Sequence, residues 1–166
     1  MALHLAADGI HFTDFSHGTT MVNELLDDYE EGTFIVAMAA SSSGTISINN
    51  NYKTCDYNKT GRLCYVGGHV RSSGSPNGSG ELNITGMPFT HYSAVSDRVT
   101  FATWYYGMTA GNPHMTAGDQ PICYMSSGAT YIRWQRGRAG IMNADMAAGM
   151  GGSTEVNFAG SYTVAT

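Results

Sequence analysis

Residues 26–34 read LDDYEEGTF, in which four carboxylates surround one tyrosine and a Gly-Thr step leads into an apolar run. The two carboxyl groups of a glycosidase must face each other across one bond, whereas neighbouring residues of an extended segment point in opposite directions. A calcium site needs several oxygen ligands that converge within about 2.6 Å, which this pattern does not favour. From the residues alone, we interpret the stretch as a solvated or capping segment in front of the first strand. The motif residues are Asp27, Asp28, Tyr29, Glu30, Glu31 and Gly32.

The sequence after Gly32 consists of short β-type runs separated by turn residues. Charged residues make up only 13% of the chain and 21 residues are glycine, a composition that disfavours helices because Ser, Thr and Asn compete for backbone hydrogen bonds. About eight evenly spaced runs predict an all-β protein, an antiparallel, jelly-roll-like β-sandwich over 26–166. Residues 1–25 lack clear periodicity and are predicted to form an irregular N-terminal docking arm or linker. The predicted strands are 33–40, 45–49, 62–71, 81–89, 98–108, 121–125, 130–136 and 154–164.

Two apolar segments predict contact with a partner surface. The run 34–38 reads FIVAM and is apolar at every position, which favours burial on both faces, with the second face covered by another copy of the chain. Residues 139–151 are too rich in glycine for a long helix and are predicted to be a loop that presents Met142, Met146 and Met150.

Charge and hydropathy exclude two classes of partner. The formal net charge is −5 with only eight Lys and Arg, and nucleic-acid binding needs clustered cations to neutralise phosphates. No apolar run approaches the ~20 residues that span a bilayer. The N-terminal MALHLAADGIHF has no basic segment, and Asp8 interrupts its apolar stretch, so we expect neither a Sec signal peptide nor membrane insertion.

The three cysteines, Cys55, Cys64 and Cys123, show neither a disulfide framework nor the paired spacing of a zinc site. We expect buried, reduced thiols. An alternative depends on the turn between them, because a four-residue hairpin loop over 58–61 would place Cys55 opposite Cys64 and permit a disulfide.

No motif in the sequence predicts catalysis. The six histidines lack metal-binding spacing, and the sequence contains no nucleophile elbow, phosphate-binding loop or dinucleotide fingerprint. We therefore predict no catalytic, metal or cofactor site. Aromatic residues gather in 104–108 and 130–136 instead, and ring faces exposed to solvent suit sugar or protein recognition, although core and subunit packing is the favoured explanation. The candidate ligand-binding aromatics are Trp104, Tyr105, Tyr131 and Trp134.

Four segments in this order resemble a domain found near the C-terminus of bacteriophage tail-fibre and related virion appendage proteins. They are LDDYEEGTF at 26–34, YNKTGRLCYVGG at 57–68, GELNITGMPF at 80–89 and VNFAGSYTV at 156–164. The resemblance implies an antiparallel β-sandwich that assembles as a homotrimer on the virion, and it implies no catalytic residues. It also implies that LDDYEEGTF marks the boundary at which the folded domain begins, with Tyr29 and Phe34 packing inward.

The resemblance leads to one main hypothesis and two alternatives. We expect a non-enzymatic virion protein, a short trimeric fibre or appendage that binds a host surface glycan or protein and contacts other virion proteins through its N-terminal arm. Loops 72–80 and 109–118 are the candidates for its exposed end. The first alternative is a capsid decoration protein that stabilises the head. The second is a glycan-cleaving virion enzyme that uses Asp27 and Asp28.

Overall fold

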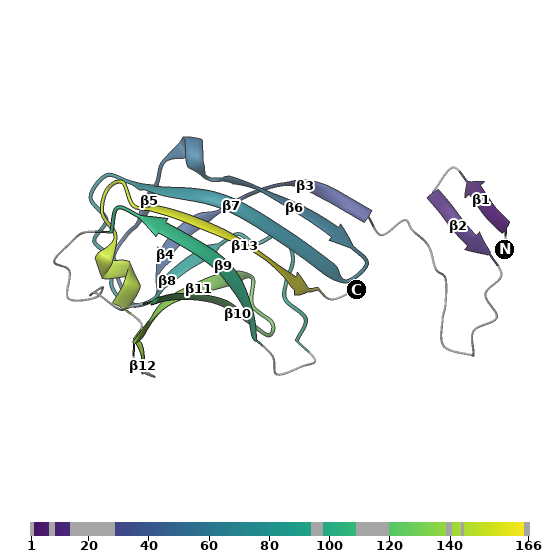
Figure 1. Ribbon diagram of the computed structural model, residues 1–166. Helices are drawn as coiled ribbons and strands as arrows, with labels where there is room; N and C mark the ends of the chain where they lie inside the picture. The colour runs from purple at the N-terminus through teal and green to yellow at the C-terminus, as the bar shows by residue number, and fades with distance from the viewer. Residues whose placement is uncertain are drawn as a thin grey trace.

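The computed structural model describes residues 2–6, 9–13, 29–93, 98–108, 120–138, 141–143 and 145–164. These residues form antiparallel β-strands, turns and two short 3₁₀ helices (Figure 1). The predicted all-β antiparallel sandwich is therefore confirmed. In chain order the elements are β1 (Ala2–Ala6), β2 (Gly9–Thr13), β3 (Tyr29–Ile35), β4 (Ala37–Ala40), β5 (Ser47–Ile48), η1 (Asn50–Tyr52), β6 (Thr54–Thr60), β7 (Leu63–Ser73), β8 (Leu82–Thr85), β9 (Arg98–Tyr106), β10 (Gln120–Ser126), β11 (Tyr131–Arg138), β12 (Ile141–Asn143), η2 (Asp145–Gly149) and β13 (Glu155–Thr163).

The strands form a nearly closed, barrel-like sandwich. The hydrogen-bonded order is β3-β6-β7-β13-β9-β10-β11-β8-β4. Strand β9 belongs to both layers, since residues 102–106 pair with β13 and residues 98–101 pair with β10. The two strands at the ends of the order, β3 and β4, are consecutive in the chain and separated only by Val36, whose N–H donates to the Lys53 carbonyl at 2.9 Å. We call β3-β6-β7-β13-β9 the first sheet and β10-β11-β8-β4 the second sheet.

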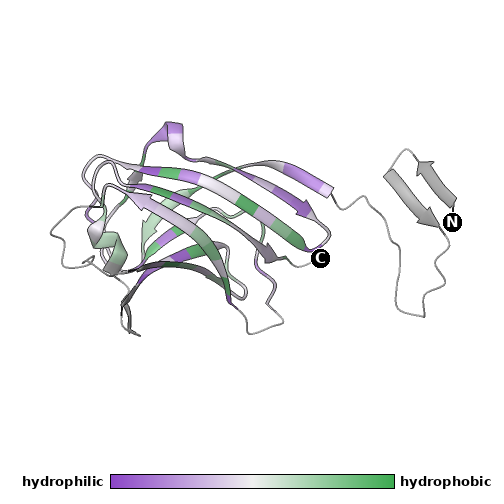
Figure 2. Cartoon of the chain, in the orientation of Figure 1, coloured by the Kyte–Doolittle hydropathy of each residue, from purple (hydrophilic) through white to green (hydrophobic). Residues whose placement is uncertain are grey.

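The core lies between the two sheets and is built by alternation along each strand. In β13, Val156, Phe158 and Tyr162 are buried while their neighbours point outward, as expected of strands with one solvated face. Figure 2 shows the resulting change of hydropathy along the strands. The largest side chains that are almost wholly buried include Trp134, Tyr162, Leu82, Ile84, Met125, Ile132 and Met146.

Four strands were not predicted. Strand β6 carries only two apolar residues on its buried side, Cys55 and Tyr57, so its TCDYNKT sequence is typical of turns and polar loops. Strands β1 and β2 pair as a separate hairpin inside the segment predicted to be irregular. Strand β12 pairs with β11 within the predicted loop 139–151.

The structure corrects the burial predicted for 34–38 and for two methionines of 139–151. Within 34–38, Phe34, Val36 and Met38 are buried and the residues between them are exposed, so the run alternates like the other strands rather than being buried on both faces. Met146 and Met150 belong to the protein's own core, which corrects the prediction that they are presented to a partner. The side chain of Met142 lies outside the described residues. Phe34 packs inward as predicted, but Tyr29 is exposed.

All three cysteines are free and buried, as expected, and the alternative Cys55–Cys64 disulfide does not form. The hairpin between β6 and β7 turns over two residues, with Gly61 at φ 55°, rather than over four. Thr60 therefore pairs with Leu63, and Cys64 stands opposite Lys59. In this register Cys55 packs against Gly68, four residues along β7 from Cys64.

Candidate functional site

The outer face of the first sheet carries an unusual number of exposed rings and apolar side chains. A group of exposed hydrophobic residues marks an interaction site more often than a single exposed residue does. Among the residues that the structure describes, all of the exposed large hydrophobic side chains belong to β3, β7 and β9: Tyr29, Ile35, Leu63, Tyr65, Trp104 and Tyr106.

Two of these rings form a flat aromatic surface at one edge of the first sheet. Alternation in β9 directs Phe101 into the core and Trp104 and Tyr106 outward, with 54% and 64% of each side chain exposed. Their rings stack with centroids 6.2 Å apart and planes 5° from parallel. Such a surface leaves an apolar ring face open to a ligand while the indole N–H and the phenol group stay hydrated.

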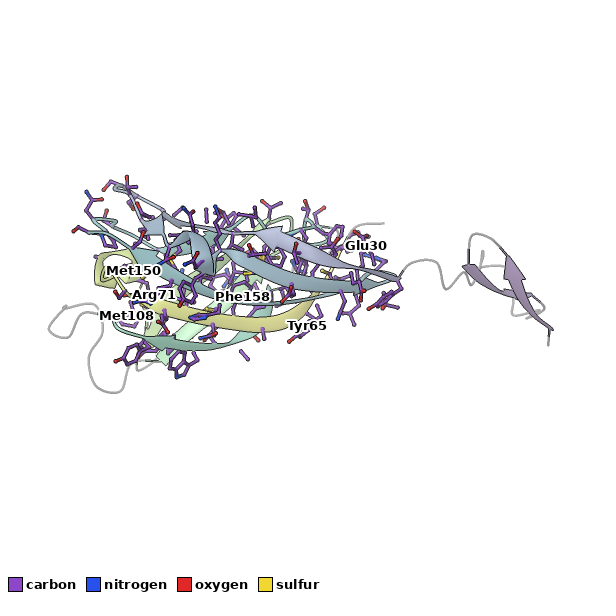
Figure 3. The ribbon with its side chains drawn as sticks, turned by 90° about the horizontal axis from the view of Figure 1, so that it is seen from above. Glu30, Tyr65, Arg71, Met108, Met150 and Phe158 are labelled. Atoms are coloured by element: carbon purple, nitrogen blue, oxygen red, sulfur yellow. The ribbon has the colours of Figure 1, made fainter. Side chains whose placement is uncertain are left out.

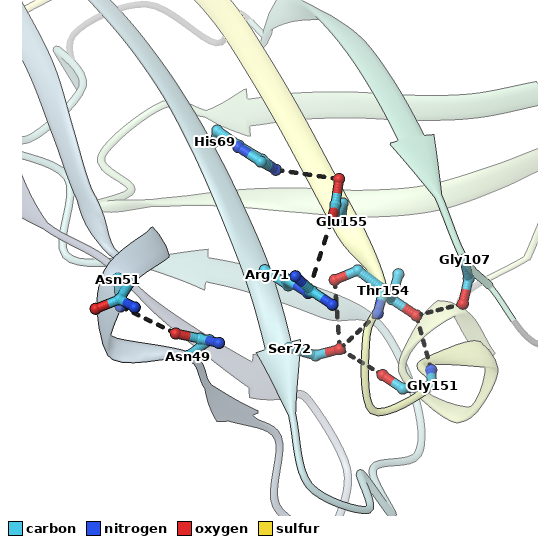
Figure 4. Close-up of polar contacts among 9 residues, drawn as sticks. All are labelled: Asn49, Asn51, His69, Arg71, Ser72, Gly107, Gly151, Thr154 and Glu155. Atoms are coloured by element: carbon cyan, nitrogen blue, oxygen red, sulfur yellow. Dashed lines mark hydrogen bonds and ion pairs between the residues drawn. The ribbon is translucent and has the colours of Figure 1, made fainter.

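Polar side chains stand beside this aromatic surface because the strands are in register. Asn157 of β13 pairs with both His69 and Trp104, and Glu155 pairs with both Arg71 and Tyr106. Glu155 also contacts two side chains of β7, with its oxygens 3.4 Å from His69 Nε2 and 3.7 Å from Arg71 Nε (Figure 4). The Tyr52 ring of η1 packs edge-on against His69 at 5.0 Å.

A buried network holds the strand ends that carry this polar cluster. The Thr154 N–H donates to Ser72 Oγ at 2.9 Å, and the Ser72 hydroxyl donates to the Gly151 carbonyl. The Thr154 hydroxyl donates to the Gly107 carbonyl at 2.9 Å and accepts from the Gly151 N–H at 2.7 Å (Figure 4). The ends of β7, β9 and β13 are thus joined directly below Arg71, Glu155 and Tyr106.

A shallow transverse groove crosses the strands of the first sheet. One residue from each strand stands in the same cross-strand row, and all but one of the five side chains are small. We define the transverse groove by this row: Thr33, Asp56, Gly67, Ala159 and Ala102. A cavity of about 470 Å³ lies at its β9 end, where Trp104 and Asn157 join Ala102 and Ala159 in the lining. A second cavity, of about 440 Å³, lies at its β3 end.

The LDDYEEGTF motif builds the β3 end of the groove. Tyr29 donates to Glu31 and Tyr57 donates to Glu30, both at 2.6 Å, and the hydrogen bond to Glu30 raises the pKa of Tyr57. The Tyr57 ring lies about 3.0 Å from where a Cβ on Gly32 would stand, so glycine permits β3 and β6 to pair closely here. Asp27 and Asp28 lie outside the described residues, and their role as boundary residues stays a prediction.

The structure separates the four candidate aromatics predicted from the sequence. Trp104 lies on the outer face of the first sheet, whereas Trp134 is only 1% exposed and belongs to the core. Tyr105 points inward and packs edge-on against Trp134 with centroids 6.2 Å apart. Tyr131 lies in the second sheet, where its hydroxyl accepts from Arg133 Nη2 at 2.8 Å. Trp134 is therefore a core residue and Tyr105 packs against it, and ligand binding by the candidate aromatics stays a prediction.

Sequence reasoning missed several residues of this face because they come from different strands. Tyr65, His69 and Asn157 were not singled out, although the period-2 alternation of β7 and β13 places them on the outward side. The predicted loop 72–80 is only partly exposed, since Ser72, Gly78 and Gly80 are buried. The predicted loop 109–118 falls outside the described residues.

Neither a cluster of metal ligands nor a membrane-spanning helix occurs among the described residues. The described residues contain no group of three or more His, Cys, Asp or Glu placed to hold a metal ion. They also contain no helix that is long and apolar enough to cross a membrane.

Comparison with known proteins gives one informative similarity of fold. No family model matches the chain, and no curated protein matches it. Among solved structures, the Dettilon tailspike protein (gp208) is similar over 82% of this chain and 24% of its own, with a TM-score of 0.69 and 18% sequence identity. At this identity the likeness is one of fold, and the chain spans about a quarter of the length of that tailspike.

Proposed function

We propose that this chain is a non-enzymatic structural protein of a bacteriophage tail appendage, located on the virion, that attaches the particle to the host surface. The similarity of fold to a part of a phage tailspike supports the location. The motif resemblance of LDDYEEGTF and the three later segments supports the same class of protein independently of the fold.

The observation that carries the attachment role is the exposed Trp104–Tyr106 stack. Ring side chains contribute most of the contact energy at recognition surfaces because they bury a large area with few rotatable bonds. Trp104 stands in one cross-strand row with two polar residues, His69 and Asn157. That combination suits a surface ligand with both apolar faces and polar edges.

A non-enzymatic role is supported by the structural contacts of two of the carboxylates of the first sheet. Glu155 bridges His69 and Arg71, and Glu30 accepts a hydrogen bond from Tyr57. Each acts as a partner in a structural contact rather than as one of two carboxylates facing each other across an open cleft, the arrangement that glycoside hydrolysis requires.

We further propose that the protein assembles as a homotrimer. The tail-fibre resemblance implies this state. Light scattering at micromolar concentration is expected to give three times the 17.7 kDa chain mass. A monomer mass would contradict the trimer without affecting the attachment role.

The attachment role is tested by binding of the purified, fluorescently labelled protein to host cells. We expect saturable binding that falls at least tenfold for Trp104→Ala and is retained by Tyr92→Ala, the same kind of change at a ring that lies outside both sheets. Absence of binding to host cells together with binding to phage capsids would replace this proposal with capsid decoration. Release of reducing sugar from host polysaccharide would contradict the non-enzymatic role.

A further inference from the structure

We propose that the transverse groove binds a neutral oligosaccharide laid across the strands, with one sugar ring on Trp104 and hydroxyl groups on Asp56 and Glu31. This inference rests on the attachment role proposed above and gives it a site and a ligand class. It depends on the shape of the groove, on the aromatic surfaces beside it and on its charge.

The shape of the transverse groove follows from the register of its five strands alone. Thr33 pairs with Asp56, Asp56 with Gly67, Gly67 with Ala159 and Ala159 with Ala102, so small side chains line up at right angles to five strands. Neighbouring strands lie about 4.8 Å apart, which makes the row roughly 19 Å long. A linear tetrasaccharide in an extended conformation has a comparable length.

Two rings flank the groove and offer stacking surfaces. Trp104 lines the cavity at the β9 end. The half-exposed Tyr65 leans over the middle of the row, because its ring lies 3.6 Å from where a Cβ on Gly67 would stand. In Figure 3, Tyr65 and Arg71 lie at the two ends of this stretch of β7. The C–H face of a pyranose packs against such rings while its hydroxyls point to the polar rim.

The polar rim supplies acceptors and donors at the positions where hydroxyls would project. The cavity at the β3 end is lined by Glu31, Thr33, Asp56 and Asn58, and Asn157 lines the other cavity. Carboxylates accept hydrogen bonds from two hydroxyls at once, and a hydrogen bond to a charged acceptor is stronger than one between neutral groups.

The charge of the groove selects against acidic sugars. Neither cavity lining contains a Lys or Arg, and the charge of the nearby Arg71 is compensated by Glu155 at 3.7 Å. A uronic or sialic acid in the groove would bring a carboxylate close to Asp56 and Glu31 without a cation between them. We therefore assign the ligand to neutral hexose or N-acetylhexosamine chains.

The same charges disfavour a protein occupant such as a second copy of this chain. A subunit interface buries its centre and is depleted of charged residues there. Covering Asp56 and Glu31 without a cationic partner would bury two uncompensated negative charges, at a high cost in desolvation. A flexible, hydroxyl-rich ligand satisfies both carboxylates and leaves them partly hydrated.

The test uses isothermal titration calorimetry of the full chain with neutral and acidic tetrasaccharides. The neutral probes are cellotetraose, maltotetraose, mannotetraose and chitotetraose, and the acidic probe is tetragalacturonic acid. We expect at least one neutral probe to bind, more tightly than its disaccharide, and at least tenfold more tightly than tetragalacturonic acid. Asp56→Asn is expected to reduce this discrimination by severalfold.

A matched pair of variants on β13 locates the site. Ala159→Arg fills the centre of the groove and should weaken binding of the neutral probe at least tenfold. Thr163→Arg introduces the same side chain on the same strand and face, four residues away, and should change the affinity less than twofold. Circular dichroism and thermal unfolding of both variants establish that each is folded.

Three outcomes would overturn the inference. Equal or tighter binding of tetragalacturonic acid would remove the charge argument, and undiminished binding by folded Ala159→Arg would place the site elsewhere. Loss of the oligomer in Ala159→Arg, with no binding of any neutral probe by the unmodified chain, would assign the groove to subunit contact. If host cells still bind the protein in that last case, attachment stands and only the proposed site fails; if cells do not bind either, both proposals fail.

Discussion

Trp104 and Tyr106 stack on the outer face of β9 with ring planes 5° from parallel. Trp134, in the second sheet of the same sandwich, is buried in the core. The two tryptophans of the chain therefore have opposite environments. This difference allows binding and stability to be tested separately.

We predict that Trp104→Ala weakens ligand binding about tenfold, which corresponds to about 1.4 kcal/mol, and changes the free energy of unfolding by less than about 1 kcal/mol. Trp134→Ala is the control and should cost about 3–5 kcal/mol of stability because it empties a large buried site. Urea unfolding measures both changes. A large loss of stability in Trp104→Ala would indicate that the ring is structural.

We predict that the intrinsic fluorescence of Trp104→Phe is shifted to shorter wavelength, since only the buried Trp134 still emits. Addition of the bound oligosaccharide should change the emission of the unmodified chain and leave that of Trp104→Phe unaltered. A ligand-dependent change that survives in Trp104→Phe would contradict contact between the ligand and this ring.

We predict opposite tolerance at two consecutive glycines of β7. A Cβ on Gly68 would overlap Cys55 Sγ and lie 2.9 Å from the Phe158 ring, both in the core, so Gly68→Ala should cost about 1–3 kcal/mol. A Cβ on Gly67 would contact only the Tyr65 ring, at 3.6 Å. Gly67→Ala should therefore leave the unfolding midpoint nearly unchanged, and equal destabilisation by the two changes would contradict this register.

The fold class could be predicted from the sequence because it depends on local signals. Alternation in 98–108 and 154–164, together with Gly-rich turns, is sufficient to predict antiparallel strands, and β9 and β13 lie within these ranges. Strand β6 was missed because its outward residues are polar and its inward ones are few. The TCDYNKT sequence of β6 therefore resembles that of a loop.

The site could be predicted only in part because it depends on register, which one sequence does not specify. A hairpin loop of two residues instead of four separates Cys55 from Cys64 and places Cys55 over Gly68. The row that joins His69, Asn157 and Trp104 likewise comes from three strands that are distant in the chain. The clustering of aromatics in the sequence identified Trp104, but it could not show that Trp134 points the other way.

We predict that the thiols react with Ellman's reagent only after unfolding, and that stability falls at alkaline pH. Burial, assisted by the carboxylate of Asp56, raises the pKa of Cys55 to about 11 from an ordinary value of 9.0, and burial also raises the pKa of Cys123. The folded state therefore holds protons that the unfolded state releases, so this contribution is complete below pH 9 and is lost as the pH rises towards 11.

The measurement is the urea midpoint at several pH values between 8 and 11, with Cys55→Ala as the control. The control should show a weaker decline because one buried thiol is gone. Addition of a reductant should not move the midpoint at any pH, since no disulfide joins Cys55 and Cys64. A midpoint that drops on reduction would contradict the observed register of β6 and β7.

We predict that Thr154→Val costs about 1–3 kcal/mol, because it removes a buried hydroxyl that bonds two backbone groups and leaves both unsatisfied. The groups are the Gly107 carbonyl and the Gly151 N–H, bonded at 2.9 and 2.7 Å. For a chain of this size the melting temperature should fall by roughly 2–10 °C. Thr60→Val, an identical change at an exposed position of β6, is expected to have little effect. Since this network holds the strand ends below Glu155 and Tyr106, Thr154→Val should also weaken oligosaccharide binding well below its melting temperature, whereas unchanged affinity would mean that the outer face is positioned without it.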